Sequence, residues 1–454
     1  MKRGIILLLI VGMPLLLHAQ DTSPEMISLE EAIELAIENN YQLKQARNDL
    51  DLAEYQEFSA KADFLPSVSA SLSGNKRVGR QFNQTTGDFG DFTINGFSSN
   101  LNTSIPLFTG FQNINNLRSS QYSSESQEET VQRVKENVIF DTASRYLQVL
   151  LDKELLQIAN ENLASSRKQL EQVQAQVEVG SRPSVDLYNQ EATVANNELE
   201  VTNRENALQI SRLQLIRTLQ IDPLGQYEFS IPDIGAEDLT PREYQLQALV
   251  DAALENRSDL QSARLNIKAI EHQLKATKGS LYPSLNFSAS LSSNYNDQNF
   301  DRATGELVGF QDQFFDQNLN RSLGLSVNIP IFDNFNRRTN VQSQLISYRN
   351  QQLSLENTEL QVVQEVNQAY TDYQAVIKQL EATEKSLRAA ERSYETERER
   401  YNVGATTLIE LSNANAQYVQ AQSDRARAVF NFVFQQKLLD YYIGRLDQNI
   451  SLNQ

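Results

Sequence analysis

The stretch 401–411 reads YNVGATTLIEL and has the composition of a tight turn between two long helices. A related stretch lies 224 positions earlier, where 179–187 reads VGSRPSVDL. Both place a Val-Gly pair after one long polar, helix-forming segment and before another. Two such turns, each at the tip of a long helical hairpin, predict the architecture of the whole chain.

The chain is a tandem duplication. Residues 28–71 align with 245–288 at an offset of 217, and later segments align at 224. The seven-residue slip falls between the strand prolines, so the second copy has the longer loop. Identical pairs include Glu38/Glu255, Pro66/Pro283, Pro106/Pro330 and Gly180/Gly404. We divide the chain into a signal peptide (1–20), a first repeat (21–222), a linker (223–241) and a second repeat with a C-terminal segment (242–454).

The N-terminus has the pattern of a secretory signal. Met1-Lys2-Arg3 precedes an apolar run over 5–17, and a small-residue exit follows at His18-Ala19-Gln20. A membrane anchor is the alternative, but about 13 apolar residues are too few to span a bilayer. Removing Lys2 and Arg3 changes the formal net charge from −18 to −20. No later stretch reaches the ~18–20 apolar residues of a spanning helix, so a mature chain that crosses a membrane would do so as a β-barrel.

The composition excludes several classes of function. The acidic charge disfavours nucleic-acid binding, and the absence of Cys excludes disulfides and thiol chemistry. His272 is the single histidine after processing, and its spacing is that of a helical surface residue. Metal-ligand spacings, phosphate loops and dinucleotide turns are absent. We therefore expect no enzyme activity, no cofactor, no metal and no nucleic-acid partner.

Four segments alternate polar and apolar residues with a period of two, which predicts short strands. The apolar face would meet a core in a soluble sandwich, or lipid in an outer-membrane barrel with a polar lumen. Four strands cannot close a barrel, so the membrane interpretation requires an oligomer, and three chains would supply twelve strands. The connections 74–96 and 292–318 are predicted hairpin loops with an aromatic rim. The strands lie at 67–72, 97–105, 284–291 and 322–329.

Each copy is predicted to begin with a helix, over 29–62 and 242–279, the first opened by a Ser28/Glu31 capping box. The long helices carry apolar residues every seven positions, which is the spacing of a coiled-coil seam. Their broad polar faces suit a wall of helices around water, with a plain coiled-coil stalk as the alternative. The seams are Val149, Leu156, Leu163, Leu170, Val177; Leu187, Val194, Val201, Leu208, Leu215; Val366, Tyr373, Leu380, Leu387, Tyr394, Tyr401; and Leu411, Tyr418, Phe432, Leu439.

Charge at the tips has two interpretations. Asp186 and Glu410 each lie six residues after the turn glycine of their copy. In an assembly of three chains, six carboxylates near one constriction would favour cations over anions. Alternatively, each carboxylate interacts with the dipole at the start of its return helix. Both roles can hold together.

These features together resemble the TolC family of outer-membrane efflux proteins over essentially the mature chain. The resemblance rests on the duplication, on LPS and YPS at 65–67 and 282–284, on IPLF and IPIF at 105–108 and 329–332, and on the two Val-Gly tips. It implies a mainly α-helical fold with a helical barrel and a smaller twelve-stranded β-barrel, built by a homotrimer. It implies an exit duct across the periplasm and outer membrane of a Gram-negative cell. The implied partners are outer-membrane lipid, a periplasmic adaptor and an inner-membrane RND or ABC transporter.

The resemblance also implies site residues. Tyr401 matches the family's periplasmic aperture tyrosine and Asp186 the acid of the first tip, while Glu410 and Asn413 stand at two aperture aspartates. Thr406 replaces the arginine of the second tip, and we expect Arg182 of the first tip to supply the cation. The implied adaptor-docking tips are Val179, Gly180, Ser181, Val403, Gly404 and Ala405.

A periplasmic coiled-coil scaffold or adaptor without a pore is the alternative function. An adaptor would need a lipoyl-like or barrel domain that splits one hairpin, and the sequence shows none. The exported substrate is left open by the sequence.

Overall fold

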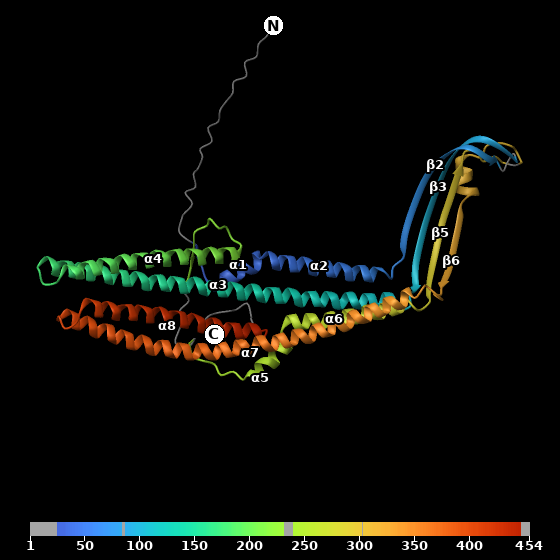
Figure 1. Cartoon of the computed structure of the whole chain (residues 1–454). Helices are drawn as coiled ribbons and strands as arrows, with labels where there is room; N and C mark the ends of the chain where they lie inside the picture. Colours follow the sequence, from blue (N-terminus) through green and yellow to red (C-terminus); the bar gives the residue numbers. More distant parts are fainter. Residues whose placement is uncertain (1–24, 84–86, 231–238, 302, 446–454) are drawn as a thin grey trace, which may run out of the picture.

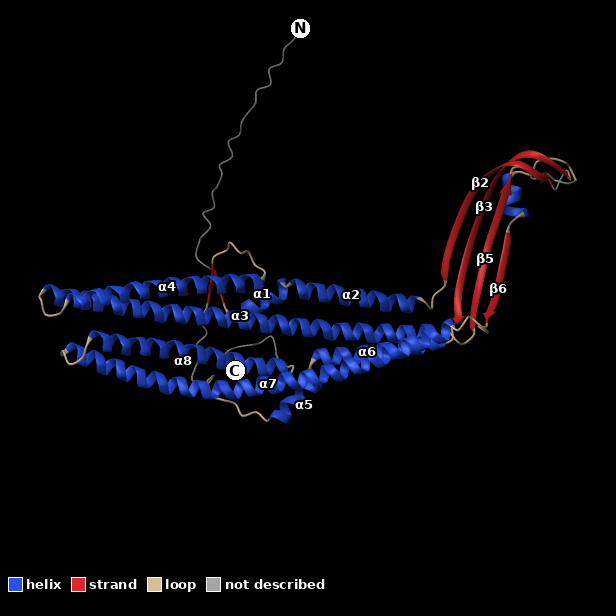
Figure 2. Ribbon diagram, in the orientation of Figure 1, coloured by secondary structure: helices blue, strands red, loops and turns tan. Residues whose placement is uncertain are grey.

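Two long helical hairpins lie side by side, and a curved sheet bends away from the end of the molecule opposite the two hairpin turns (Figure 1). This computed structural model describes residues 25–83, 87–230, 239–301 and 303–445. The predicted signal peptide, 1–20, lies outside the described residues, as do parts of the predicted linker and of the C-terminal segment. In the described chain, helices make up most of the structure and the four long strands gather at one end (Figure 2).

The first hairpin consists of α3 (Gln112–Glu178) and α4 (Ser184–Leu219), and the second of α7 (Asn336–Asn402) and α8 (Leu408–Tyr442). Both α3 and α7 have 67 residues, which gives each a length of about 100 Å. The predicted seven-residue seams are confirmed as the packing surface, since Leu215, Val366 and Phe432 are fully buried. The remaining faces are largely exposed and polar, as expected for long two-helix packing.

The shorter helices are each broken once, so the predicted single helices 29–62 and 242–279 are wrong. The first is divided into α1 (Leu29–Asn39) and α2 (Tyr41–Ala62), and the second into α5 (Leu246–Asn256) and α6 (Ser258–Gly279). Asn40 leaves the helical conformation with ψ 123°, and its side-chain oxygen accepts the N–H groups of Gln42 and Leu43. This is an N-cap that restarts the helix, so a polar side chain produces the break without Pro or Gly. The Ser28/Glu31 capping box is confirmed.

The sheet is antiparallel in the order β2-β3-β5-β6. Its register aligns apolar residues across the strands, as in Ala70↔Leu101↔Leu291, and places the polar ones on the other face. The period-two prediction is therefore confirmed as one apolar and one polar face. The strands are β2 (Ser67–Asn83), β3 (Asp88–Phe108), β5 (Ser284–Asn296) and β6 (Asn320–Asn328).

The two hairpins of the sheet differ in length, and the predicted loop over 74–96 is wrong. Pairing of β2 with β3 continues from Gly74↔Phe97 to Asn83↔Asp88, because backbone hydrogen bonds do not depend on the side chains that made this stretch look like a loop. In the second copy β6 has 9 residues, and a π-helix, η1 (Asp312–Gln317), packs beside β5. The longer connection accounts for the seven-residue slip between the repeats.

The turn from sheet to long helix is built in the same way in both copies. Gly110 and Phe111 have φ of 64° and 67°, and Asn334 and Phe335 have 56° and 64°. In each turn the second aromatic ring packs edge-on against an earlier one, with Phe108–Phe111 and Phe332–Phe335 centroids 5.1 and 5.6 Å apart. This shared geometry supports the duplication at the level of structure.

A small parallel sheet joins the chain's start to the inter-repeat segment. Strand β1 (Glu25–Ile27) pairs with β4 (Tyr227–Phe229), and the buried Tyr146 hydroxyl of α3 donates to the carbonyl of Ser230 over 2.7 Å. This contact ties the segment across the middle of the first hairpin. Among the described residues, no helix is both long and apolar enough to cross a membrane.

Candidate functional site

The two hairpin tips form one packed unit. Val173 of α3 lies in a buried cluster with Tyr401, Leu408 and Leu411 of the second hairpin, so residues predicted from separate repeats meet here. The shared core fixes the lateral distance between the two turns. Any function at the tips therefore belongs to both repeats jointly.

Each turn closes its helix with the same hydrogen bonds. In the first, Ser181 N–H donates to Gln176 O at 2.8 Å and Gly180 N–H to Val177 O at 3.0 Å. In the second, Ala405 and Gly404 make the equivalent bonds. This is the Schellman motif, which needs positive φ at the glycine, here 72° and 77°. Val179 and Val403, one residue before each glycine, are both 79% exposed and form apolar points at the ends of the molecule.

Tyr401, Arg182 and Asp186 come together between the tips. The Tyr401 ring is 3% exposed, and the guanidinium carbon of Arg182 lies 4.1 Å from its centroid. Arg182 Nη1 also lies 3.6 Å from Asp186 Oδ2. Burial raises the pKa of the Tyr401 phenol, and the cation of Arg182 opposes this rise only in part. Tyr401 is therefore a neutral phenol that carries a stacked guanidinium.

The Tyr401 hydroxyl is buried and has no hydrogen-bond partner within the part of the chain that the structure describes. The side chain of Gln169 lies beside it and, as a weak hydrogen-bonding neighbour, lowers the pKa of the phenol slightly, although the two groups do not reach the geometry of a full hydrogen bond. A buried, unpaired hydroxyl costs roughly 1–3 kcal/mol.

Glu410 and Asn413 are placed differently from this group, on the exposed side of α8. Glu410 accepts from the Thr406 hydroxyl and, at 3.1 Å, from the Thr407 N–H, completing a capping box. These two bonds lower the pKa of Glu410. Glu410 therefore is an ionised cap of α8, and Thr406, which replaces the expected arginine, serves that cap.

A row of side-chain amides behind the tips was missed from the sequence. Asn415 of α8 donates to Asn162 of α3 at 2.8 Å, and Asn162 donates to Asn197 of α4 at 3.2 Å. The row lines a polar cavity of about 110 Å³ between the hairpins. The sequence signal for this row is the asparagine that flanks the apolar seam at a corresponding level of each of the three helices.

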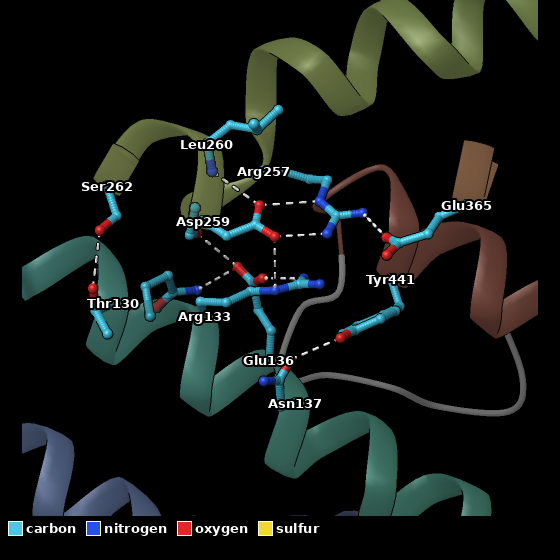
Figure 3. A network of polar contacts seen from close by, with 12 residues as sticks. Thr130, Arg133, Glu136, Asn137, Arg257, Asp259, Leu260, Ser262, Glu365 and Tyr441 are labelled. Carbon is cyan, nitrogen blue, oxygen red and sulfur yellow. Dashed lines mark hydrogen bonds and ion pairs between the residues drawn. The ribbon is translucent and has the colours of Figure 1, made fainter. Parts of the chain in front are cut away.

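A second polar group, also missed in the sequence analysis, joins helices of both repeats (Figure 3). Arg257, at the break between α5 and α6, has a side chain that is 4% exposed. Its nitrogens lie 3.0 and 2.6 Å from the two Asp259 oxygens and 2.7 Å from Glu365 Oε2. Burial alone would raise the pKa of Asp259, but the Arg257 guanidinium holds it below its ordinary value.

The same group reaches α3 and α8 (Figure 3). Ser258 donates to Glu136 of α3 at 3.0 Å, and Arg133 pairs with Glu136 at 3.2 Å. The Arg133 guanidinium also lies 4.4 Å above the Tyr441 ring of α8. We call Arg133, Glu136, Arg257, Asp259 and Glu365 the central ion-pair network. It joins α3, α6 and α7, and so connects the two repeats.

A family model described as "Outer membrane efflux protein" matches residues 32–219 and 249–439, and so covers most of both repeats. The chain belongs to the outer membrane efflux protein family. This confirms the resemblance to TolC proteins and the expected location in the outer membrane of a Gram-negative cell. The matched ranges include the tips, the amide row and the central ion-pair network.

Curated relatives of this efflux protein are distant. It is 24% identical over 311 residues to outer membrane efflux protein BepC of Brucella suis, covering 67% of this chain and 60% of that one. It is 25% identical to the pyoverdine export outer membrane protein OpmQ of Pseudomonas aeruginosa, over 60% of this chain and 57% of that one. The chain thus spans less than two thirds of the length of these relatives. The chain is 22% identical to outer membrane protein TolC of Salmonella enteritidis, over 90% of this chain and 80% of that one.

Solved structures show the fold of the efflux protein. It resembles the CusC channel with a TM-score of 0.78 at 19% identity, covering 92% of each chain. It resembles the CmeC outer membrane channel of Campylobacter jejuni with a TM-score of 0.78 at 17% identity, and the match covers 93% of this chain and 87% of that one. The predicted fold class, long α-helical hairpins with a smaller antiparallel sheet in the manner of these channels, is confirmed.

Proposed function

We propose that three copies of the chain form an exit duct through the outer membrane, as the passive outer component of a tripartite efflux pump or a type I secretion system. The open, curved sheet carries this proposal. Its edge strand β6 exposes Leu323, Leu325 and Val327 by 78%, 67% and 63% on one face, and β2 and β6 have no further strand beside them in the described chain. Open edges are not tolerated in lipid, so β6 of one copy would pair with β2 of the next. Three copies supply twelve strands.

The helices offer matching surfaces for such neighbours. Ile346, Leu353 and Leu360 lie seven apart on α7 and are 56%, 64% and 66% exposed. On α2, Tyr55 and Phe58 are 72% and 68% exposed. Apolar rows at coiled-coil spacing on an otherwise polar surface favour packing against another helix. The polar faces would then line a water-filled lumen.

The tips would form the periplasmic mouth. Arg182 stacks on Tyr401 from the other hairpin, so the first repeat supplies a cation where the second has Thr406. Asp186 and Glu410 would place acidic side chains near the mouth, and Asn413 would add a polar group beside them. The exposed turns Val179–Ser181 and Val403–Ala405 would contact a periplasmic adaptor, which links the duct to an RND or ABC transporter.

Membrane fractionation with gel electrophoresis of unheated samples tests the assembly. We expect the protein in outer-membrane fractions as a heat-dissociable trimer that conducts ions in planar bilayers. A soluble monomer without conductance would refute the duct and would favour the pore-free scaffold, to which the family match gives no support.

Crosslinking tests adaptor docking. Since the sequence has no Cys, Ser181→Cys and Ala405→Cys each introduce a single thiol at one turn. We expect a photoactivatable probe at either position to capture an adaptor in cells. Ser354→Cys, at an exposed position far along α7, serves as the control, and equal capture from that position would remove the tips from the docking surface.

A further inference from the structure

A cavity of about 300 Å³ lies where the sheet meets the second long helix. Ile331, Phe332, Phe335 and Arg338 are among its lining residues. Ile331 is 94% exposed and continues the apolar face of β6, and Phe332 and Phe335 are 71% and 58% exposed. The cavity therefore opens at the border of the face that the proposed duct would present to lipid.

Comparison of this junction with the equivalent junction of the first repeat shows which of its residues make structural contacts shared by both. In the second copy Arg337 donates to the carbonyl of Ser280, which follows α6. In the first copy Asn113, at the equivalent position, donates to the carbonyl of Asp63, which follows α2, at 3.1 Å. Arg337 thus makes the same contact between turn and helix end as Asn113 does. It also pairs with Asp333 at 3.2 Å, so the charge of Asp333 is already compensated.

Arg338 has no such structural counterpart. Its equivalent in the first copy is Ile114, so the two junctions differ here by a cation. Arg338 is exposed, and its guanidinium carbon lies 5.8 Å from the centroid of the Phe335 ring. Among the described residues no carboxylate pairs with it. The second junction therefore carries an uncompensated guanidinium at the edge of an exposed aromatic pair.

We propose that this cavity binds the phosphate of an anionic phospholipid from the periplasmic leaflet of the outer membrane. The planar guanidinium of Arg338 would donate to the phosphate oxygens, and its position near Phe335 limits the freedom lost on binding. The acyl chains would follow the exposed row of Val327, Ile329 and Ile331. This inference rests on the orientation in the proposed function, with the sheet in the membrane and the helices in the periplasm.

Native mass spectrometry of the full-length purified oligomer tests the site, with palmitoyl-oleoyl phosphatidylglycerol and the zwitterionic phosphatidylcholine as probes. We expect preferential retention of phosphatidylglycerol and about tenfold weaker binding in Arg338→Gln, the loss typical of one charged hydrogen-bonding group. Arg349→Gln removes an exposed arginine further along α7 and should leave the affinity unchanged. Ile114→Arg should add a second site of the same preference to each chain.

Equal affinity of wild type and Arg338→Gln, or no retained phosphatidylglycerol in the wild type, would overturn the proposal. Glycerol 1-phosphate has the headgroup without acyl chains, and effective competition by it would show a free phosphate site and no lipid site. Conductance of the wild-type oligomer in planar bilayers is measured in parallel. A conducting oligomer that fails the lipid test leaves the duct intact, whereas a wild type without conductance refutes the duct itself.

Discussion

The guanidinium of Arg182 and the ring of Tyr401 stack at 4.1 Å and join the tips of the two repeats. Arg182 follows the first turn glycine, and Tyr401 precedes the second. The contact is thus made between hairpins, at the end of the molecule where their shared core is narrow. Together with the buried cluster around Val173, it gives a direct contact through which a change at one tip can reach the other.

Arg182→Gln should open the mouth of the duct. The change removes a cation–π contact of about 1 kcal/mol and the ion pair with Asp186. We expect a higher mean single-channel conductance in planar bilayers, with an intermediate value for Arg182→Lys, which keeps the charge without the planar stacking group. Arg167→Gln is the control, because Arg167 pairs with Glu198 at a more exposed place on the same hairpin. Equal conductance in all four proteins would leave the contact a purely structural one.

Glu410→Gln combined with Asp186→Asn should reduce cation selectivity. Both carboxylates lie in the first turn of their return helices, and the structure gives Glu410 the capping role in addition. Reversal potentials under a salt gradient measure the selectivity, and Glu356→Gln on the exposed face of α7 is the control. If the double variant keeps the wild-type reversal potential, both residues act on their helices alone.

The contribution of Glu410 to cation selectivity should persist to unusually acidic pH. Its pKa is lowered by bonds from Thr406 and Thr407, so its negative charge is present above the ordinary value of 4.5 and is lost only as pH falls through the lower value. In the Asp186→Asn background, selectivity should therefore change little between pH 7 and about 5. Thr406→Val removes the hydroxyl donor, and its selectivity should begin to fall at higher pH than that of the parent.

The sequence predicts the long hairpins well because a seven-residue seam is compatible with one pattern of burial. Leu215, Val366 and Phe432 were identified in this way and are fully buried. The breaks at Asn40 and Arg257 were not predicted, because neither residue is a helix breaker by propensity. Asn40 acts through its own cap bonds, and Arg257 through Asp259, two residues on, and Glu365, 108 residues away along the chain.

The tip residues could be proposed from the register between the repeats, but their mutual contact could not. Alignment placed Asp186 opposite Glu410, whereas the structure groups Asp186 with Arg182 and Tyr401 and leaves Glu410 to cap α8. Which residues meet depends on how the hairpins lie beside each other. That arrangement is set by the core around Val173 and by the amide row, neither of which a linear pattern specifies.

Arg257→Met should strongly destabilise the fold. It leaves Glu365 without its cation and Asp259 with only the more distant Arg133, at 3.7 Å, and breaking a buried ion pair in this way costs about 3–5 kcal/mol. Thermal unfolding followed by circular dichroism measures the loss. Arg264→Met, which removes the more exposed pair with Glu359, should cost about 1 kcal/mol or less.

Adding Glu365→Gln to Arg257→Met should restore part of the lost stability, because it removes one of the uncompensated charges. Strictly additive losses would show that the central ion-pair network is not coupled.

Gly279→Ala tests the contact between the repeats at the base of the sheet. A Cβ at this position would lie 2.5 Å from the backbone oxygen of Gly110. The usual gain of Ala over Gly in a helix is about 1 kcal/mol, whereas overpacking costs about 1–3 kcal/mol, so we expect net destabilisation. Gly309→Ala is the control, since its nearest neighbour is a side-chain oxygen at 3.6 Å. The measurement is the dissociation temperature of the oligomer in detergent. It should fall for Gly279→Ala, and an unchanged or higher temperature would mean that the junction can separate without loss.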